Sequence, residues 1–295
     1  MLLELTTRCM PSRLGLALTI VTMLLASSGC GQYISNAKKS FAEDLSATIL
    51  DHDDSETIQQ AMPAYMVLVS SMIRSDPDNT GLLMTGAKLY GAYSSVFVEN
   101  KDRQRVLSSR AFEYASHAVC VTKPAVCDMR NNSYHQFEVS LKQFSKQDAA
   151  VLFSLGSAWA GLIQASSSDW NAVAELPRAE AVMQRVLQLD ETTSNGDAHI
   201  YMGVMQSLLP ESMGGKPELA KAHFEKAIKI SKGVNLMARL MYAEKYARLV
   251  FDRQLHDRLL KEILDADIGK SANRLIDAVV QERARKLLAN ADDYF

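Results

Sequence analysis

The 295-residue sequence lacks the motifs that mark the common enzyme classes. It has no His-Glu-x-x-His or Gly-x-Ser-x-Gly motif, no Cys-x-x-Cys pair and no glycine loop that could bind phosphate. The segment from Gly214 to Pro217 lacks the spaced first glycine of such a loop and the Ser or Thr after its lysine. Pro217 and Glu218 are instead typical of the first turn of a helix. These absences predict a protein that is not an enzyme and carries no cofactor.

Runs of basic residues and clusters of metal ligands are also absent from the sequence. The 32 basic and 34 acidic residues are interspersed, and no run of Lys or Arg is longer than two. Such a chain offers no positive surface to nucleic acid. The six histidines are not paired at metal-ligand spacing within a helix, so we predict no metal site and expect most of them at the surface or partly buried. They are His52, His117, His135, His199, His223 and His256.

Long apolar runs are scarce, and the clearest one lies near the amino terminus. Leu14 to Ala26 is 13 residues long. At about 1.5 Å per helical residue, this run is too short to cross a hydrocarbon core of about 30 Å. Arg8 and Arg13 precede it, and the small residues Ser27 to Gly29 follow it. This order predicts that residues 1–29 are a signal peptide, and we expect no other segment to span a membrane.

Cys30 stands directly after these small residues. The stretch from Leu25 to Cys30 resembles a bacterial lipobox, with Ser27 where leucine is commoner. Its thiol could carry a diacylglycerol and the new amino terminus a further acyl chain, and several chains anchor a protein firmly. We predict lipidation at Cys30, residues 30–50 as anchor, tether and first helix, and contact with the membrane through this lipid alone. The alternative is an ordinary signal peptide followed by an incidental cysteine.

The other cysteines of the mature chain are Cys120 and Cys127. In one continuous helix their α-carbons would lie about 10 Å apart, too far for a bridge, so a disulfide requires Pro124 to turn the chain. An exported protein meets conditions that favour disulfides. In the chain-entropy model this short loop would stabilise the fold by roughly 2.5 kcal/mol. Two buried free thiols are the alternative.

Helical periodicity dominates the sequence from about Ile34 onward. Apolar residues recur at helical spacing, and the 7 prolines and 14 glycines mostly fall between the periodic segments. No pair of segments has the pattern of paired strands. We predict an all-α fold in which residues 51–295 form one domain of stacked antiparallel helical hairpins, a tetratricopeptide-like α-solenoid.

Three candidate repeats have a glycine in the first helix and alanines along one face of the second. Small residues at these positions would let paired helices approach closely. The spacing from glycine to alanine is 25, 23 and 17 residues, which is longer than in regular repeats and predicts enlarged loops gathered on one binding face. The packing residues are Gly86, Ala111, Gly156, Ala179, Gly203, Ala220, Phe224 and Ala227.

Further helices are predicted on either side of these repeats. Asp76 to Asn79 is typical of a turn, and it predicts a hairpin upstream, around Thr57 to Ser75. Leu236 to Val250 and Leu255 to Ala266 predict another hairpin. Ser271 to Ala289 predicts a charged terminal helix that caps the stack.

Two tryptophans are the aromatic candidates for a ligand cavity. Trp159 and Trp170 could line such a cavity, but an aromatic residue on a repeat helix is more often part of the core. The sequence therefore identifies no ligand-binding residue.

The segment from Ser207 to Ala227 combines an interrupted repeat loop, a Leu-Pro-Glu stretch, a Gly-Gly turn and a helix face with Ala and Phe. With these features the sequence resembles the T-component (TatT) family of TRAP-type transporters. The resemblance extends from the lipobox-like start through Leu155–Trp159 to the end at Leu287–Phe295. It implies a periplasmic lipoprotein with cryptic tetratricopeptide-like hairpins that forms a homotrimer and binds the substrate-binding P component. It also implies a pore-like cavity that could pass on the ligand of that component.

The residues and the resemblance together predict a non-enzymatic accessory subunit of a solute uptake system. It would hold a periplasmic solute-binding protein near the membrane and could shelter an apolar ligand. Gly31 gives no retention signal, which favours the outer membrane over the inner one. Two other functions remain open: a lipoprotein scaffold for envelope assembly, and a hydrolase of envelope polymers, for which the sequence offers no converging pair of carboxylates.

Overall fold

The structure is a computed structural model that describes residues 40–295, except 42–43, 50, 53, 214 and 272. The described part of the chain is helical and contains no strand, which confirms the all-α prediction. The predicted signal peptide and Cys30 lie outside the described residues. The main helices are α2 (Ser55–Ser75), α3 (Thr80–Phe97), α4 (Lys101–Thr122), α5 (Tyr134–Leu141), α6 (Ala149–Ala165), α7 (Trp170–Val173), α8 (Leu176–Asp190), α9 (Asp197–Gln206), α10 (Pro217–Ile230), α11 (Leu236–Met241), α12 (Arg253–Leu264) and α13 (Arg274–Ala289).

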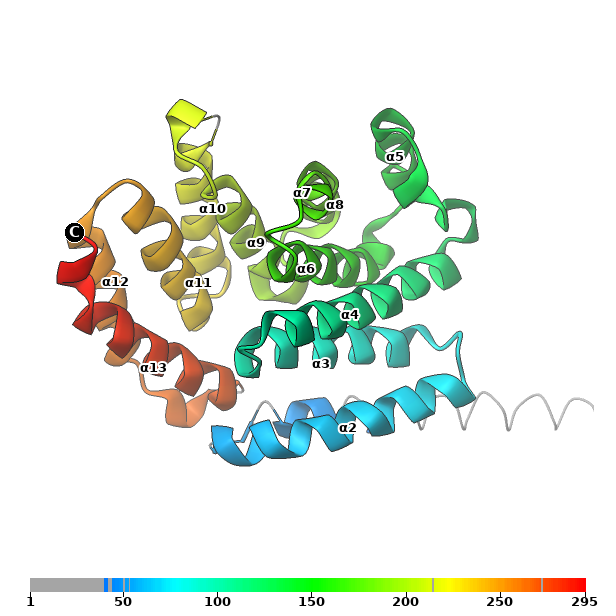
Figure 1. The fold of residues 1–295 in the computed structure, drawn as a ribbon, viewed down its shortest axis with the longest axis horizontal. Coiled ribbons are helices and arrows are strands. Elements are labelled where there is room, and N and C mark those ends of the chain that lie inside the picture. Colours follow the sequence, from blue (N-terminus) through cyan, green and yellow to red (C-terminus); the bar gives the residue numbers. More distant parts are fainter. Residues whose placement is uncertain (1–39, 42–43, 50, 53, 214, 272) are drawn as a thin grey trace, which may run out of the picture.

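Successive long helices pack against one another and form an arc from α2 to α13 (Figure 1). The three predicted repeats correspond to the packed pairs α3 with α4, α6 with α8, and α9 with α10. The next predicted hairpin consists of α11, which continues as a π-helix over Tyr242–Ala247, and α12. Pro217 occupies the first turn of α10, as the sequence predicts.

One prediction is wrong, because Ser55–Ser75 is a single helix and not a hairpin. Asp54 caps its start by accepting hydrogen bonds from the backbone N–H groups of Glu56 and Thr57 at 2.9 and 3.2 Å. Pro63 lies inside the helix without ending it, and the chain leaves the helix only at Asp76. This helix, α2, packs on α3.

The enlarged connections are not all where the glycine spacing placed them. Helices α3 and α4 are long and are joined by residues 98–100 only, so the extra length of this repeat lies in its helices. The long connections are residues 123–148, which contain α5, residues 166–175, which contain α7, and residues 207–216. All three project to the same side of the arc, the upper side in Figure 1.

The last helix closes on the beginning of the fold. Arg274 in the first turn of α13 donates hydrogen bonds from Nε to the carbonyl oxygen of Asp51 at 2.8 Å and from Nη2 to its carboxylate at 2.9 Å. Leu275 belongs to the larger hydrophobic core, which spans α2 to α9, whereas the smaller core spans α9 to α13. Helix α13 thus covers the end of the stack and also contacts its first helix.

A second prediction needs correction, because Lys146–Ala165 is long and apolar enough to cross a membrane by length and composition. Half of this segment is buried inside the fold, and its helix, α6, packs against α4, α8 and α3. A core helix of a folded domain passes the same test, so the packing of α6 identifies it as part of the core.

The small residues of the repeats lie between the paired helices. A Cβ atom at Gly203 would lie 2.8 Å from the Phe224 ring, and one at Gly156 would lie 3.0 Å from Met183. Glycine therefore lets each second helix pack directly on the backbone of the first. All eight positions are buried: Gly86, Ala111, Gly156, Ala179, Gly203, Ala220, Phe224 and Ala227.

We expect the substitution Gly203→Ala to destabilise the fold by about 1–3 kcal/mol, because the new methyl group would collide with the buried Phe224 ring. Gly161→Ala is the matched control, since a Cβ atom there would meet nothing within 4 Å. Its better helix propensity should stabilise α6 by about 0.5–1 kcal/mol. Urea unfolding of both variants measures the difference, and equal effects would show that the α9–α10 packing is not tight.

Candidate functional site: a braced groove between α5 and α8

A groove of about 320 Å³ lies between α5 and α8 and extends to α9. Nine of its thirteen lining residues are polar or charged. Helix α5 contributes Tyr134 and Glu138 to one wall, and α8 contributes Glu180, Gln184 and Gln188 to the other. Because these three residues of α8 are spaced four apart, they form a polar row along one face of the helix.

The deepest polar residue of the groove is Gln206, at the end of α9. Its side chain is only 9% exposed, and its Oε1 atom has no hydrogen-bond partner among the described residues. Leu141 and Met202 line the groove nearby and are almost fully buried. A buried acceptor without a partner costs free energy, so this position favours a ligand that can donate a hydrogen bond.

Charges of both signs surround the groove. Burial raises the pKa of Glu180, an effect that Lys216 partly offsets. Burial also raises the pKa of Tyr134, together with the nearby charges of Glu138 and Glu180. Glu138 and Glu180 share the groove with Lys142, Lys216 and Arg185, so its lining carries charges of both signs. Its chemistry suits a neutral partner with both donors and acceptors.

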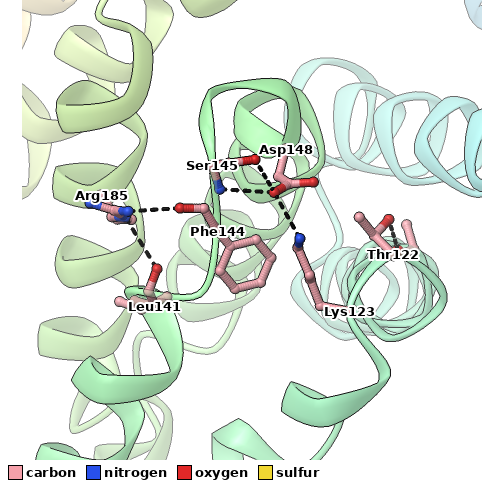
Figure 2. A network of polar contacts seen from close by, with 8 residues as sticks. Thr122, Lys123, Leu141, Phe144, Ser145, Asp148 and Arg185 are labelled. Carbon is pink, nitrogen blue, oxygen red and sulfur yellow. Dashed lines mark hydrogen bonds and ion pairs between the residues drawn. The ribbon is translucent and has the colours of Figure 1, made fainter.

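Arg185 of α8 braces the end of α5. Its Nε atom donates to the carbonyl oxygen of Leu141 at 3.1 Å, and its Nη2 atom donates to that of Phe144 at 2.7 Å (Figure 2). The Leu141 carbonyl belongs to the last residue of α5 and also accepts the backbone N–H of Phe144 at 3.3 Å, whereas Phe144 lies three residues beyond the helix. The guanidinium therefore binds the end of α5 and the turn that follows it. The carboxyl end of α5 is thereby tied to α8.

The chain beyond α5 is tied to α4 by a second polar contact (Figure 2). The buried carboxylate of Asp148 accepts hydrogen bonds from the backbone N–H and the hydroxyl of Ser145, both at 2.8 Å. It also pairs with the Lys123 ammonium at 3.2 Å. Burial by itself would raise the pKa of Asp148, but these hydrogen bonds and the lysine outweigh burial and lower the pKa.

The beginning of the α5 segment is tied down as well. A disulfide joins Cys120 and Cys127, with their α-carbons 4.5 Å apart, and Pro124 starts the 3₁₀ turn that reverses the chain between them. Arg178 of α8 donates a hydrogen bond to the carbonyl oxygen of Asn132 at 2.7 Å. Both ends of the groove wall are therefore fixed to the stack.

Glu175, just before α8, connects the chain before α5 to the core. It accepts two hydrogen bonds from Arg130, at 3.0 and 2.8 Å, and one from the indole N–H of Trp159 at 2.9 Å. The Arg130 guanidinium also lies 4.7 Å from the centre of the Phe112 ring. Trp159 is 1% exposed and belongs to the larger hydrophobic core.

The residues of the groove were not singled out by the sequence. The repeat-packing residues lie between the helices, and none of them lines the groove. The sequence feature that could have indicated the groove was the row of polar residues on α8. Arg178 and Arg185 accompany this row and lie on one face of the helix, because they are seven residues apart. A row of this kind is usual on any solvated helix, so only the contact with α5 distinguishes it.

Two histidines form a pair outside the groove. The Nδ1 atoms of His199 on α9 and His223 on α10 lie 2.8 Å apart, so one donates to the other. His199 and His256 are buried, unlike the surface or partly buried position expected for most histidines. No metal-binding group of three ligands occurs among the residues that the structure describes.

A family model described as TRAP transporter T-component matches residues 51–295, which include every helix of the groove and of the brace. A search of curated proteins found no match.

We expect Arg185→Lys to loosen α5, because a single ammonium cannot hold the two carbonyls that the guanidinium binds. Hydrogen exchange of residues 134–145 should become faster, with little change elsewhere. Arg258→Lys on the exposed face of α12 is the control and should leave exchange over α5 unchanged. Unchanged exchange in both variants would mean that Arg185 does not hold the helix.

Stability should fall as the pH is lowered from about 6.5 to about 4. Burial, followed by the charge of His223, lowers the pKa of His199 to about 4, whereas its ordinary value is 6.5. Between these values the unfolded chain binds the proton and the folded chain does not, which costs up to about 3 kcal/mol. His199→Asn should flatten this part of the pH profile of urea unfolding. A profile that keeps its full slope in His199→Asn would assign the effect to other groups.

Proposed function

Because the chain belongs to the family of TRAP transporter T-components, we propose that it is the accessory subunit that binds the periplasmic solute-binding P component of such a transporter. Membership in this family makes the protein an accessory component of a transporter rather than a member of a known enzyme family. The observation that carries the proposal of partner binding is the one-sided projection of its long connections (Figure 1).

The projecting segments carry large apolar side chains that are exposed. Trp170 at the start of α7 is 85% exposed, and Leu208 and Leu209 in the connection before α10 are 52% and 45% exposed. Exposed apolar residues that gather on one side of a molecule are typical of a surface for a protein partner. Trp170, which the sequence offered as a residue for a ligand cavity, belongs instead to this proposed surface.

A backbone hydrogen bond joins the two ends of the connection that carries Leu208 and Leu209. The backbone N–H of Lys216 donates to the carbonyl oxygen of Gln206 at 3.2 Å and closes the loop at its base. A Cβ atom at Gly215 would lie 1.7 Å from the carbonyl oxygen of Leu209, so only glycine fits there. A hydrogen bond between these ends reduces the conformational entropy that they lose on binding.

The proposed subunit is attached to the periplasmic face of a membrane by lipid on Cys30, which would keep the bound receptor close to the transporter. A homotrimer is part of the same proposal and rests on the family resemblance. The predominantly polar groove does not favour an apolar ligand at that position. An apolar ligand would need a different site.

Receptor binding should weaken at least tenfold in the double variant Leu208→Glu/Leu209→Glu, because charge replaces exposed apolar contact area. The lipidated protein in mild detergent is the bait, the purified solute-binding protein of the same system is the probe, and light scattering gives the size of the complex. Val67→Glu on α2 is the control, since Val67 is 69% exposed and lies away from the projecting loops.

Equal binding by the double variant and the control would show that this loop is not the contact. Recovery of envelope-assembly proteins without any receptor would favour the scaffold function and contradict the transporter function.

A further inference from the structure

We propose that the groove between α5 and α8 binds an extended polypeptide segment through the main-chain amides of that segment. The inference rests on the proposed function in one respect only, which is that the solute receptor supplies the segment.

The polar row on α8 has the repeat of an extended chain. Glu180, Gln184 and Gln188 follow one another at four-residue intervals, and each interval corresponds to a rise of about 6 Å along the helix. Two residues of an extended chain span about 6.7 Å, so every second peptide group can meet one member of the row. A glutamine offers both a donor and an acceptor, which matches a peptide group.

The amides of this row are available for a partner. Gln184 makes no hydrogen bond to any residue in the described part of the chain. Gln188 uses its Oε1 atom to accept a hydrogen bond from Arg185 at 3.3 Å, which directs its NH₂ group to other acceptors. At the deep end of the groove, the unpartnered Oε1 atom of Gln206 can accept a main-chain N–H.

The walls of the groove are fixed before any segment binds. Arg185 ties the end of α5 to α8, Arg178 ties its beginning, and the Cys120–Cys127 disulfide closes the base of the insertion. A rigid site avoids the entropy cost of ordering its walls on binding.

A peptide suits this groove better than a small solute does. Pockets for small ligands are mostly apolar and bury most of the ligand, whereas most lining residues here are polar. Tyr134, which is 42% exposed on the wall opposite the polar row, can contact side chains of the segment. Lys216 lies both on the groove and at the base of the loop that carries Leu208 and Leu209, so groove and loop form one continuous surface.

The test uses the full chain and a phage-displayed library of random twelve-residue peptides. Enriched peptides are synthesised, and their affinity is measured by fluorescence anisotropy for the wild type, for Gln184→Ala/Gln188→Ala and for the control Gln254→Ala on the exposed face of α12. We expect at least tenfold weaker binding to the double variant and no change in the control. Methylation of alternate main-chain nitrogens of the peptide should weaken binding at least tenfold, and methylation of the intervening ones should not.

The inference is overturned if no enriched peptide depends on the two glutamines, or if binding is insensitive to main-chain methylation. The purified receptor is then added as a competitor. Displacement of the peptide supports the receptor as the source of the segment. A receptor that binds the wild type and the double variant equally, without displacing the peptide, overturns that source and leaves the proposed function intact. A receptor that does not bind the wild type refutes the proposed function, and the peptide measurements still decide for or against the groove.

Discussion

The close approach of paired helices is the constraint on which the rest of this structure depends. Phe224 can pack directly on α9 only because Gly203 has no Cβ atom, and Met183 packs on α6 at Gly156 for the same reason. Helices that meet at this distance leave no room between them for the long connections, which therefore emerge at the side of the arc (Figure 1). A packing requirement inside the stack thus determines where the exposed loops stand.

Helix α8 connects the packed core to the groove. One face of α8 places Ala179, Val182 and Val186 in the core, and these side chains are fully buried. Another face holds α5 through Arg178 and Arg185, and the polar row that lines the groove lies along the same helix. Because the core fixes the position of α8, the groove has a defined width, as a site that recognises a partner by hydrogen bonds requires.

The short helix α5 would not be stable by itself, since eight residues are too few for an isolated helix in water. Its stability comes from contacts at its two ends: the disulfide and Arg178 at one end, and Arg185 with the Asp148 network at the other. These partners come from separate parts of the chain. Because these partners are far apart in the sequence, local sequence patterns cannot predict the wall of the groove.

Local patterns were sufficient for several features of this protein. Helical periodicity predicts the all-α fold, because it depends on side chains only a turn or two apart. The Gly and Ala positions indicate where two helices can approach closely. The sequence by itself could not show that α2 is one helix, since a proline such as Pro63 ordinarily ends or kinks a helix. It also could not show the groove, because nothing in the local sequence distinguishes Gln184 and Gln206 from other polar residues. Only tertiary packing buries Gln206 and places Gln184 in the groove beside α5. Periodicity thus determined the fold class, small residues indicated where helices can approach closely, and tertiary structure alone decided the groove, because its walls are joined by contacts between residues more than forty positions apart.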